Sequence, residues 1–279
     1  MKKYIRLLIV VTLTVASLPS AVFAGSIFVS GHDPIWHSVL GGNPLGAKNL
    51  AVTAIEYARD GSALPFLFVE SISVPVPPGN AKEAPFLITG LGYVASDFVV
   101  MDGAALSGLA DFRTTLNSYS AIVVASDHGG MLTAAELGFL NTNSVDVIDY
   151  LNAGGGLAAF AESDAKGLIG STPRFQFLPF LVSSLDFQTP ESGNTVTPFG
   201  ASLGLTNADV NGNFSHNYFS ATGGMSPVDL FNGEPDRPLS LAFRGRVGSG
   251  GVDVPEPATF VLTGLGLAGF GFLRGRGRE

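Results

Sequence analysis

The sequence contains no cysteine, and this absence excludes several kinds of site. Disulfide bonds, cysteine nucleophiles and thiolate metal centres are all ruled out. Basic residues are also few, because residues 25–254 hold 9 Lys and Arg against 21 Asp and Glu, a net charge of −12. Such an acidic balance argues against nucleic acid or anionic lipid as a partner, since both are negatively charged. Apolar residues make up 46% of the chain, enough for a large core.

The first 24 residues have the pattern of a secretory signal peptide. Lys2, Lys3 and Arg6 precede an apolar run that reaches Leu18, and small residues stand before a predicted cleavage point after Ala24. The run is shorter than the roughly 20 residues that a membrane-spanning helix requires. An uncleaved anchor is the alternative, but the pattern favours removal by signal peptidase.

The last 26 residues contain three elements in a fixed order. A proline-rich motif comes first, an uncharged run over 258–273 second and an arginine cluster third. The motif and the cluster consist of Pro255, Glu256, Pro257, Arg274, Arg276 and Arg278. A helix over the uncharged run would rise about 24 Å and leave the arginines on the cytoplasmic side. An ordinary C-terminal membrane anchor is the alternative interpretation.

This arrangement resembles the PEP-CTERM sorting signal over residues 254–279. The resemblance implies recognition by an exosortase, a membrane transpeptidase-like enzyme that cuts near the Pro-Glu-Pro motif. It also implies a Gram-negative host that makes extracellular polysaccharide, and a location in the cell envelope or at the extracellular surface. The membrane is then a partner through the C-terminal helix before processing. Exopolysaccharide or another envelope component is the expected partner afterwards.

Between the two signals, residues 25–247 form one predicted domain and residues 248–253 a flexible linker. Apolar runs at 121–125 and 157–161 predict buried strands, and the stretch between them has helical spacing. Its Thr133 and Glu136 have the spacing of a capping box at a helix start, and the helix is expected to end at Asn152. Strands alternating with helices predict a three-layer α/β domain, with a parallel sheet and helices on both faces. Beyond Pro173 we expect an irregular, β-rich extension of this sheet.

Polar residues follow three of the predicted strands, where ligands bind in open parallel sheets. Each of the four histidines also stands in a polar, loop-like context. The candidate ligand site consists of His32, Asp33, His37, Asp127, His128, Glu162 and His216. Imidazole and carboxylate groups together could hold a divalent, Zn²⁺-like ion or carry out acid–base chemistry. The candidate metal ligands are His32, His37, His128 and His216. The alternative is that these residues cap strand ends and turns.

A second candidate is a calcium loop. Asp209, Asn211 and Asn213 offer oxygen atoms at positions 1, 3 and 5 of such a loop. Position 6 is Phe214, where glycine is expected, and position 12 is Ser220, where a bidentate Glu belongs. A hydrogen-bonded turn is the alternative interpretation.

Several short motifs together resemble the class I glutamine amidotransferase-like superfamily, and within it the trehalose-utilisation-type (ThuA-like) branch. They are Gly31-His32-Asp33, Tyr119–Gly130 and Tyr150–Glu162, and the resemblance extends over residues 26–220. It implies a flavodoxin-like sheet. Amidotransferases place a cysteine nucleophile after the strand that corresponds to 157–161, where this chain has Glu162 or Ser163. Glutamine hydrolysis is therefore not carried over.

Two functions are compatible with these features. The first is a non-catalytic binding or structural protein of the cell envelope, associated with extracellular polysaccharide. The alternative is a metal-assisted hydrolase or isomerase that acts on carbohydrate-like substrates. No catalytic residue is assigned, and whether the protein is an enzyme is left open at this point.

Overall fold

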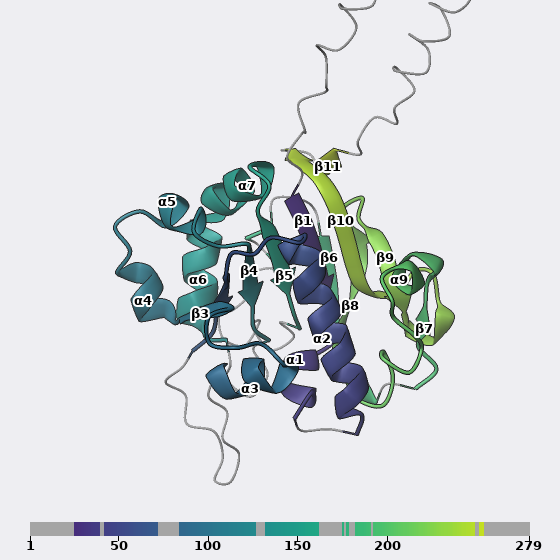
Figure 1. Ribbon diagram of the computed structural model, residues 1–279. Helices are drawn as coiled ribbons and strands as arrows, with labels where there is room; N and C mark the ends of the chain where they lie inside the picture. The colour runs from purple at the N-terminus through teal and green to yellow at the C-terminus, as the bar shows by residue number, and fades with distance from the viewer. Residues whose placement is uncertain are drawn as a thin grey trace, which may run out of the picture.

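The computed structural model describes most of the chain between residues 25 and 253 (Figure 1). The described residues are 25–39, 42–71, 84–126, 132–161, 175, 177–178, 182–190, 192–248 and 251–253.

Strands and helices alternate along the first part of this domain. The strands are β1 (Gly25–Ser30), β2 (Phe66–Val69), β3 (Phe98–Met101), β4 (Ala121–Val124) and β5 (Gly156–Ala159). The helices are α1 (Pro34–His37), α2 (Pro44–Arg59), α3 (Ala84–Leu91), α4 (Gly103–Ser107), α5 (Phe112–Leu116), α6 (Ala134–Thr142) and α7 (Ser144–Asn152). The later part is mostly strand, with β6 (Val182–Pro190), β7 (Thr195–Val196), α9 (Pro198–Ser202), β8 (Phe214–Thr222), β9 (Ser226–Leu230), the 3₁₀ turn η2 (Phe231–Gly233), β10 (Pro238–Gly248) and β11 (Gly251–Asp253).

The central sheet has the strand order β3-β2-β4-β5-β1-β10-β9-β7, with β11 paired to β10. Strands β3, β2, β4, β5 and β1 run parallel to one another. Strands β10, β9 and β7 then extend the sheet by antiparallel pairing. All residues of β1, β2, β4 and β5 are buried, as expected for strands covered on both faces.

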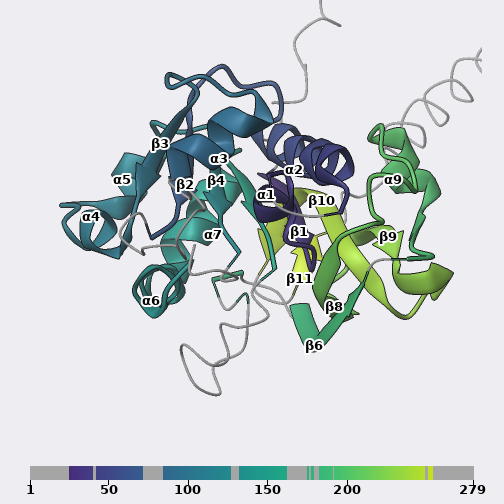
Figure 2. The same ribbon diagram turned by 90° about the horizontal axis from the view of Figure 1, so that it is seen from below.

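Helices cover the two faces of the sheet separately. Leu50 and Ile55 of α2 and Ile88 of α3 pack on one face, in a cluster with Phe28 and Phe68 of the sheet. The other face carries the apolar side chains of α4, α5, α6 and α7. Figure 2 shows α2 and α3 on one side of the sheet and α6 and α7 on the other. The prediction of a three-layer α/β domain with a mostly parallel sheet is therefore confirmed.

The helix predicted between Thr133 and Asn152 is two helices. The predicted capping box is confirmed, because Thr133 and Glu136 bond reciprocally at the start of α6. Asn143 then leaves helical geometry, with φ −101° and ψ 25°, and its side-chain amide donates to the Phe139 carbonyl at 2.8 Å. This bond satisfies a terminal carbonyl of α6, and α7 begins at the next residue.

The part after residue 173 both widens the central sheet and forms a second, two-stranded sheet. In the second sheet β6 and β8 pair antiparallel, and β8 also packs against β10. The predicted linker 248–253 overlaps β11, whose backbone pairs with β10 from Arg246 to Gly248. This pairing ties residues 251–253 to the domain.

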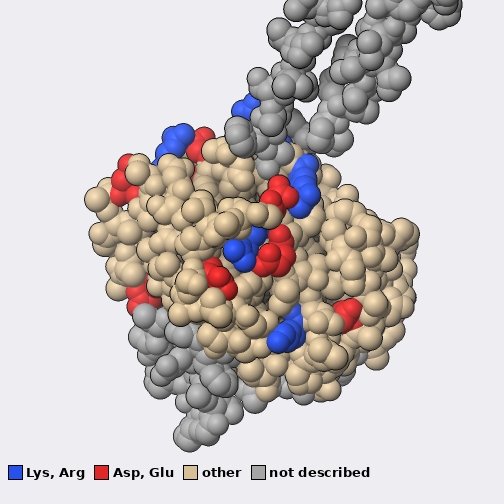
Figure 3. Space-filling model, viewed as in Figure 1, with Lys and Arg blue, Asp and Glu red and all other residues tan. Residues whose placement is uncertain are grey.

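Charged side chains on the face seen in Figure 3 are scattered over an otherwise uncharged surface, and opposite charges lie close together. Arg244 and Asp60 form such a pair at 2.7 Å, and Arg59 and Glu56 another at 2.9 Å. Within the described ranges, no helix is both long enough and apolar enough to cross a membrane.

Candidate functional site

Three of the seven residues predicted to form the site come together in the structure. Asp33, His37 and His216 are all buried, and their potential ligand atoms lie within 4.8 Å of one another. We call these three residues the metal triad. Asp127, His128 and Glu162, which the sequence also placed in the site, lie outside the described residues.

Local geometry explains why Asp33 and His37 face the same space. Asp33 stands at the N-cap of α1, Pro34 fills the first helical position, and His37 is the last residue of this turn. The His37 amide donates to the Asp33 carbonyl at 3.2 Å. Residues four apart on a helical turn lie above one another, so the two side chains share one face.

The third residue of the metal triad, His216, comes from β8 in the later part of the domain. The amide of His216, on β8, donates to the Gly31 carbonyl at 2.8 Å, and a bridge joins His32 to Ser215. The rings of His37 and His216 lie nearly parallel, at 13° and 6.5 Å between centroids. The β8 contact with the end of β1 therefore brings His216 to α1.

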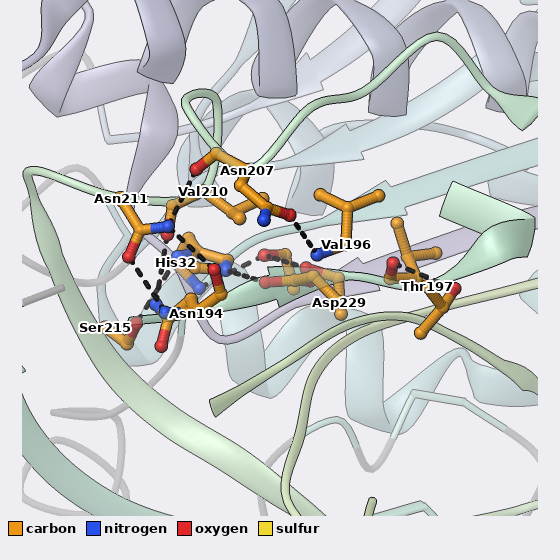
Figure 4. Close-up of polar contacts among 12 residues, drawn as sticks. His32, Asn194, Val196, Thr197, Asn207, Val210, Asn211, Ser215 and Asp229 are labelled. Atoms are coloured by element: carbon orange, nitrogen blue, oxygen red, sulfur yellow. Dashed lines mark hydrogen bonds and ion pairs between the residues drawn. The ribbon is translucent and has the colours of Figure 1, made fainter. Parts of the chain in front are cut away.

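His32 is next to the metal triad but has a different set of contacts. Its Nε2 lies 2.8 Å from Oδ2 of Asp229 on β9, and its Nδ1 lies 3.3 Å from Oγ of Ser215 (Figure 4). Both ring nitrogens of His32 therefore contact protein atoms. In this conformation the predicted ligand His32 has no nitrogen left for an ion.

Ser215, His32 and Asp229 are the residue types of a serine-hydrolase triad, and their contacts form a chain. However, none of the three is exposed by more than 2%, and Ser215 is completely buried. A nucleophile must reach its substrate, so this arrangement does not support serine catalysis. Sequence analysis missed Ser215 and Asp229, which lie 183 and 197 residues from His32 with no local motif to single them out.

A small, partly open cavity of about 10 Å³ adjoins the metal triad. Its lining consists of His32, Asp33, Pro34, His37, Ala47, Leu50, Asp209 and Asn213. About 10–15 Å³ on this measure holds one water molecule, so the space suits a single ion or water. Pockets for small molecules usually measure about 300–1,000 Å³.

The predicted calcium ligands instead hold together the loop before β8. Asp209 Oδ2 accepts from the amide and hydroxyl of Thr206, and Asn213 exchanges two bonds with the backbone of Asn43. The Asn211 side chain bonds to the Asn194 backbone in both directions (Figure 4). These contacts match the turn interpretation of the sequence, because each side chain satisfies backbone groups of the loop.

Another buried acid, which sequence analysis missed, follows β2. Glu70 is 1% exposed, and among the described residues its Oε2 has no hydrogen-bond partner. Burial, with a smaller contribution from the charge of Glu136, raises the pKa of Glu70 to about 9. The signal was present in the sequence, since a carboxyl directly follows the apolar run of β2.

Glu70 also stands at a special place in the topology. The helix after β2, α3, packs on one face of the sheet, and the helix after the neighbouring strand β4, α6, packs on the other. The chain thus diverges between the carboxyl ends of β2 and β4, where open α/β sheets commonly bind ligands. The metal triad lies at the same edge, after β1, three strands away.

Comparison with known protein families identifies the C-terminal segment. Residues 253–276 match the PEP-CTERM protein-sorting motif. The chain matches none of the curated proteins with which it was compared. Except for Asp253 at the end of β11, this motif lies outside the described residues, as does the predicted signal peptide of residues 1–24. The match confirms the predicted sorting signal: the chain is an exported protein that an exosortase processes, and it is delivered through the membrane to the cell envelope or surface.

Proposed function

We propose that the domain of this exported protein holds one divalent transition-metal ion through Asp33, His37 and His216. The observation that carries the proposal is the convergence of these three buried side chains within 4.8 Å. Two imidazoles and one carboxylate on one side of a centre form a common metal-binding set with positions left open.

The donor set favours zinc and its neighbours over calcium or magnesium. Imidazole nitrogen suits Zn²⁺, Fe²⁺, Co²⁺, Ni²⁺ and Cu²⁺, whereas Ca²⁺ and Mg²⁺ prefer oxygen. Two donors at a tetrahedral zinc ion lie roughly 3.3 Å apart, given bonds of about 2.0–2.1 Å. The triad therefore needs to contract by no more than about 1.5 Å, which small side-chain rotations can supply.

We further propose that the protein is a non-catalytic binding component of the envelope, associated with extracellular polysaccharide. Delivery to the surface supports this, because polysaccharide is a major material there. The cavity of about 10 Å³ beside the triad also supports it, since a sugar substrate needs far more room. In this view the ion joins α1 to β8 and stabilises the carboxyl edge of the sheet.

The metal proposal predicts about one ion per chain in full-length protein purified without affinity metals. Removing the ion with EDTA is expected to lower Tm by about 5–10 °C, because a tightly bound ligand adds about 3–4 kcal/mol of stability. His216→Ala and Asp33→Asn should both contain no ion by elemental analysis.

Asp209→Asn is the matched control, because Asp209 lines the same cavity but already accepts hydrogen bonds from Thr206 and Asn49. This variant should keep the ion. Wild-type protein that contains no metal, and whose Tm does not change with added Zn²⁺, would rule the proposal out.

A metal-assisted hydrolase or isomerase acting on carbohydrate-like substrates is the second candidate. Three protein ligands leave a coordination position open for water, as in catalytic zinc sites. The proposed ThuA-like resemblance is compatible with this candidate. A ThuA-like domain would need the same strand order as this sheet. Here the parallel strands follow the order β3-β2-β4-β5-β1, and β1 lies beside the antiparallel strand β10.

One experiment separates the two candidates. Full-length protein is sedimented with exopolysaccharide from a Gram-negative host, and released sugar is measured in the supernatant. We expect cosedimentation without sugar release. Release that disappears with EDTA and in His216→Ala would favour the hydrolase, and neither cosedimentation nor release would contradict both candidates.

A further inference from the structure

We infer that the buried chain Ser215–His32–Asp229 positions the ligands of the metal triad. This inference rests on the proposed function and names residues that act on the ion through others. His32 immediately precedes Asp33, and Ser215 immediately precedes His216. The contact between His32 and Ser215 therefore joins the two segments that carry the ligands.

The Ser215–His32–Asp229 hydrogen-bond chain is anchored in the central sheet. Asp229 lies opposite Ser240 in the pairing of β9 with β10, and Ser240 lies opposite Ser30 in the pairing of β10 with β1. The hydroxyls of Ser30 and Ser240 are 2.9 Å apart, and the His32 amide donates to the Ser30 hydroxyl at 3.1 Å. Ring and backbone of His32 are thus both held by neighbouring strands.

The ring contact fixes the far segment as well. Ser215 Oγ meets His32 Nδ1, while the His32–Ser215 bridge and the His216 amide bond to Gly31 hold the start of β8 against the end of β1. Figure 4 shows His32 between Asp229 and Ser215. With both segments held, Asp33 and His216 have little freedom to move apart.

The buried contact between His32 and Asp229 is not explained by its contribution to stability alone. The His32 and Asp229 side chains are 3% and 0% exposed, and among the described residues Oδ1 of Asp229 has no hydrogen-bond partner. Burying an ion pair costs desolvation that its attraction often fails to recover, and apolar substitutes are often as stable. A directional His–Asp contact does set a ring orientation, which apolar packing sets less sharply. The role of the His32–Asp229 contact is therefore to place the metal ligands that adjoin it.

The test is a Co²⁺ titration of full-length wild-type, Asp229→Asn and Ser215→Ala proteins, followed by the d–d absorption of bound Co²⁺. This absorption reports coordination geometry, which a purely structural role would leave unchanged. We expect both variants to bind Co²⁺ about 10–100-fold more weakly, the range typical of residues that support metal ligands. Their absorption bands should also shift and broaden.

Tyr150→Phe is the matched control. It removes another buried hydrogen bond, from Tyr150 Oη to the Tyr119 carbonyl at 3.0 Å, at the opposite edge of the sheet. We expect this variant to lose comparable stability but to keep wild-type Co²⁺ affinity and spectrum.

The outcomes separate the inference from the proposed function. Wild-type protein that does not bind Co²⁺ contradicts the proposed function, and the inference with it. Wild-type protein that binds, together with variants that keep its affinity and spectrum, overturns the inference alone. If Asp229→Asn does not fold, the smaller change Ser215→Ala decides the question by the same two readouts.

Discussion

The Gly31→Ala variant is expected to lose metal binding and several kcal/mol of stability together. A Cβ at residue 31 would lie 1.8 Å from the carbonyl oxygen of Asn217 and 2.7 Å from its carbonyl carbon. These are backbone atoms of β8, so the strand itself must move away. His216 lies on the same stretch of β8 and bonds to the Gly31 carbonyl. The movement therefore displaces a proposed metal ligand.

Removing this overlap needs a shift of at least about 1 Å in a fully buried region, where packing is dense. We expect the free energy of unfolding to fall by about 3–5 kcal/mol, the range for strained core substitutions. Co²⁺ affinity should fall by more than about 100-fold, because the triad geometry is lost. Urea denaturation and Co²⁺ titration of the full-length protein measure the two effects.

Gly138→Ala provides the control. A Cβ at this position of α6 meets no atom within 4 Å, and the residue is helical. Alanine should therefore stabilise the helix by about 0.5–1 kcal/mol and leave metal binding unchanged. If Gly31→Ala unfolds with the wild-type free energy and binds Co²⁺ with wild-type affinity, the Asn217 backbone does not lie as close to residue 31 as described.

Replacing Glu70 by Gln is expected to remove most of a pH dependence of stability. Burial, and then the charge of Glu136, raise the pKa of Glu70 from 4.5 to about 9 in the folded protein. Between these two pH values the unfolded chain releases the Glu70 proton while the folded domain keeps it. The stabilising contribution is thus complete below about pH 4.5 and is lost as pH rises toward 9.

The size of the effect follows from the shift. The difference between the unfolded and folded pKa of Glu70 corresponds to at most about 6 kcal/mol in the free energy of unfolding, at about 1.4 kcal/mol per pKa unit. Structural relaxation around a buried charge reduces the cost, so we expect wild-type stability to fall by about 2–4 kcal/mol more than that of Glu70→Gln between pH 5.5 and 8.5. Urea denaturation at the two pH values measures it.

The comparison isolates Glu70 because every other side chain is the same in both proteins. Glu234→Gln is the control, since its side chain is 42% exposed and paired to Arg237 at 3.2 Å near the surface. This variant should keep the wild-type pH dependence. Equal pH dependence in wild type and Glu70→Gln would mean that Glu70 is ionised or solvated in the folded protein.

Much of the fold could be predicted because it is encoded locally. The four apolar residues of β4 and of β5 predict strands covered on both faces, and Thr133 with Glu136 predicts the start of α6. The break at Asn143 was not predicted. Helical spacing continues across this residue, and the break appears only in its non-helical backbone angles and its side-chain bond to Phe139.

The candidate site was predicted in part, for a similar reason. Asp33 and His37 could be named from their polar context after a strand, but the sequence placed them in a loop, and only the structure shows that α1 brings them onto one turn. His216 could be named from its polar context but not located. Glu70 was missed although its position after β2 is visible in the sequence.

The sequence by itself determined delivery and fold class, because these depend on contiguous residues. The sorting motif of residues 253–276 is such a contiguous signal. Only the tertiary structure decided that His216 joins Asp33 and His37, and that His32 pairs with Asp229 and Ser215 instead. Those contacts join residues almost 200 positions apart. They exist because β10 pairs with β1 and itself contacts β9 and β8, and no local pattern specifies that packing.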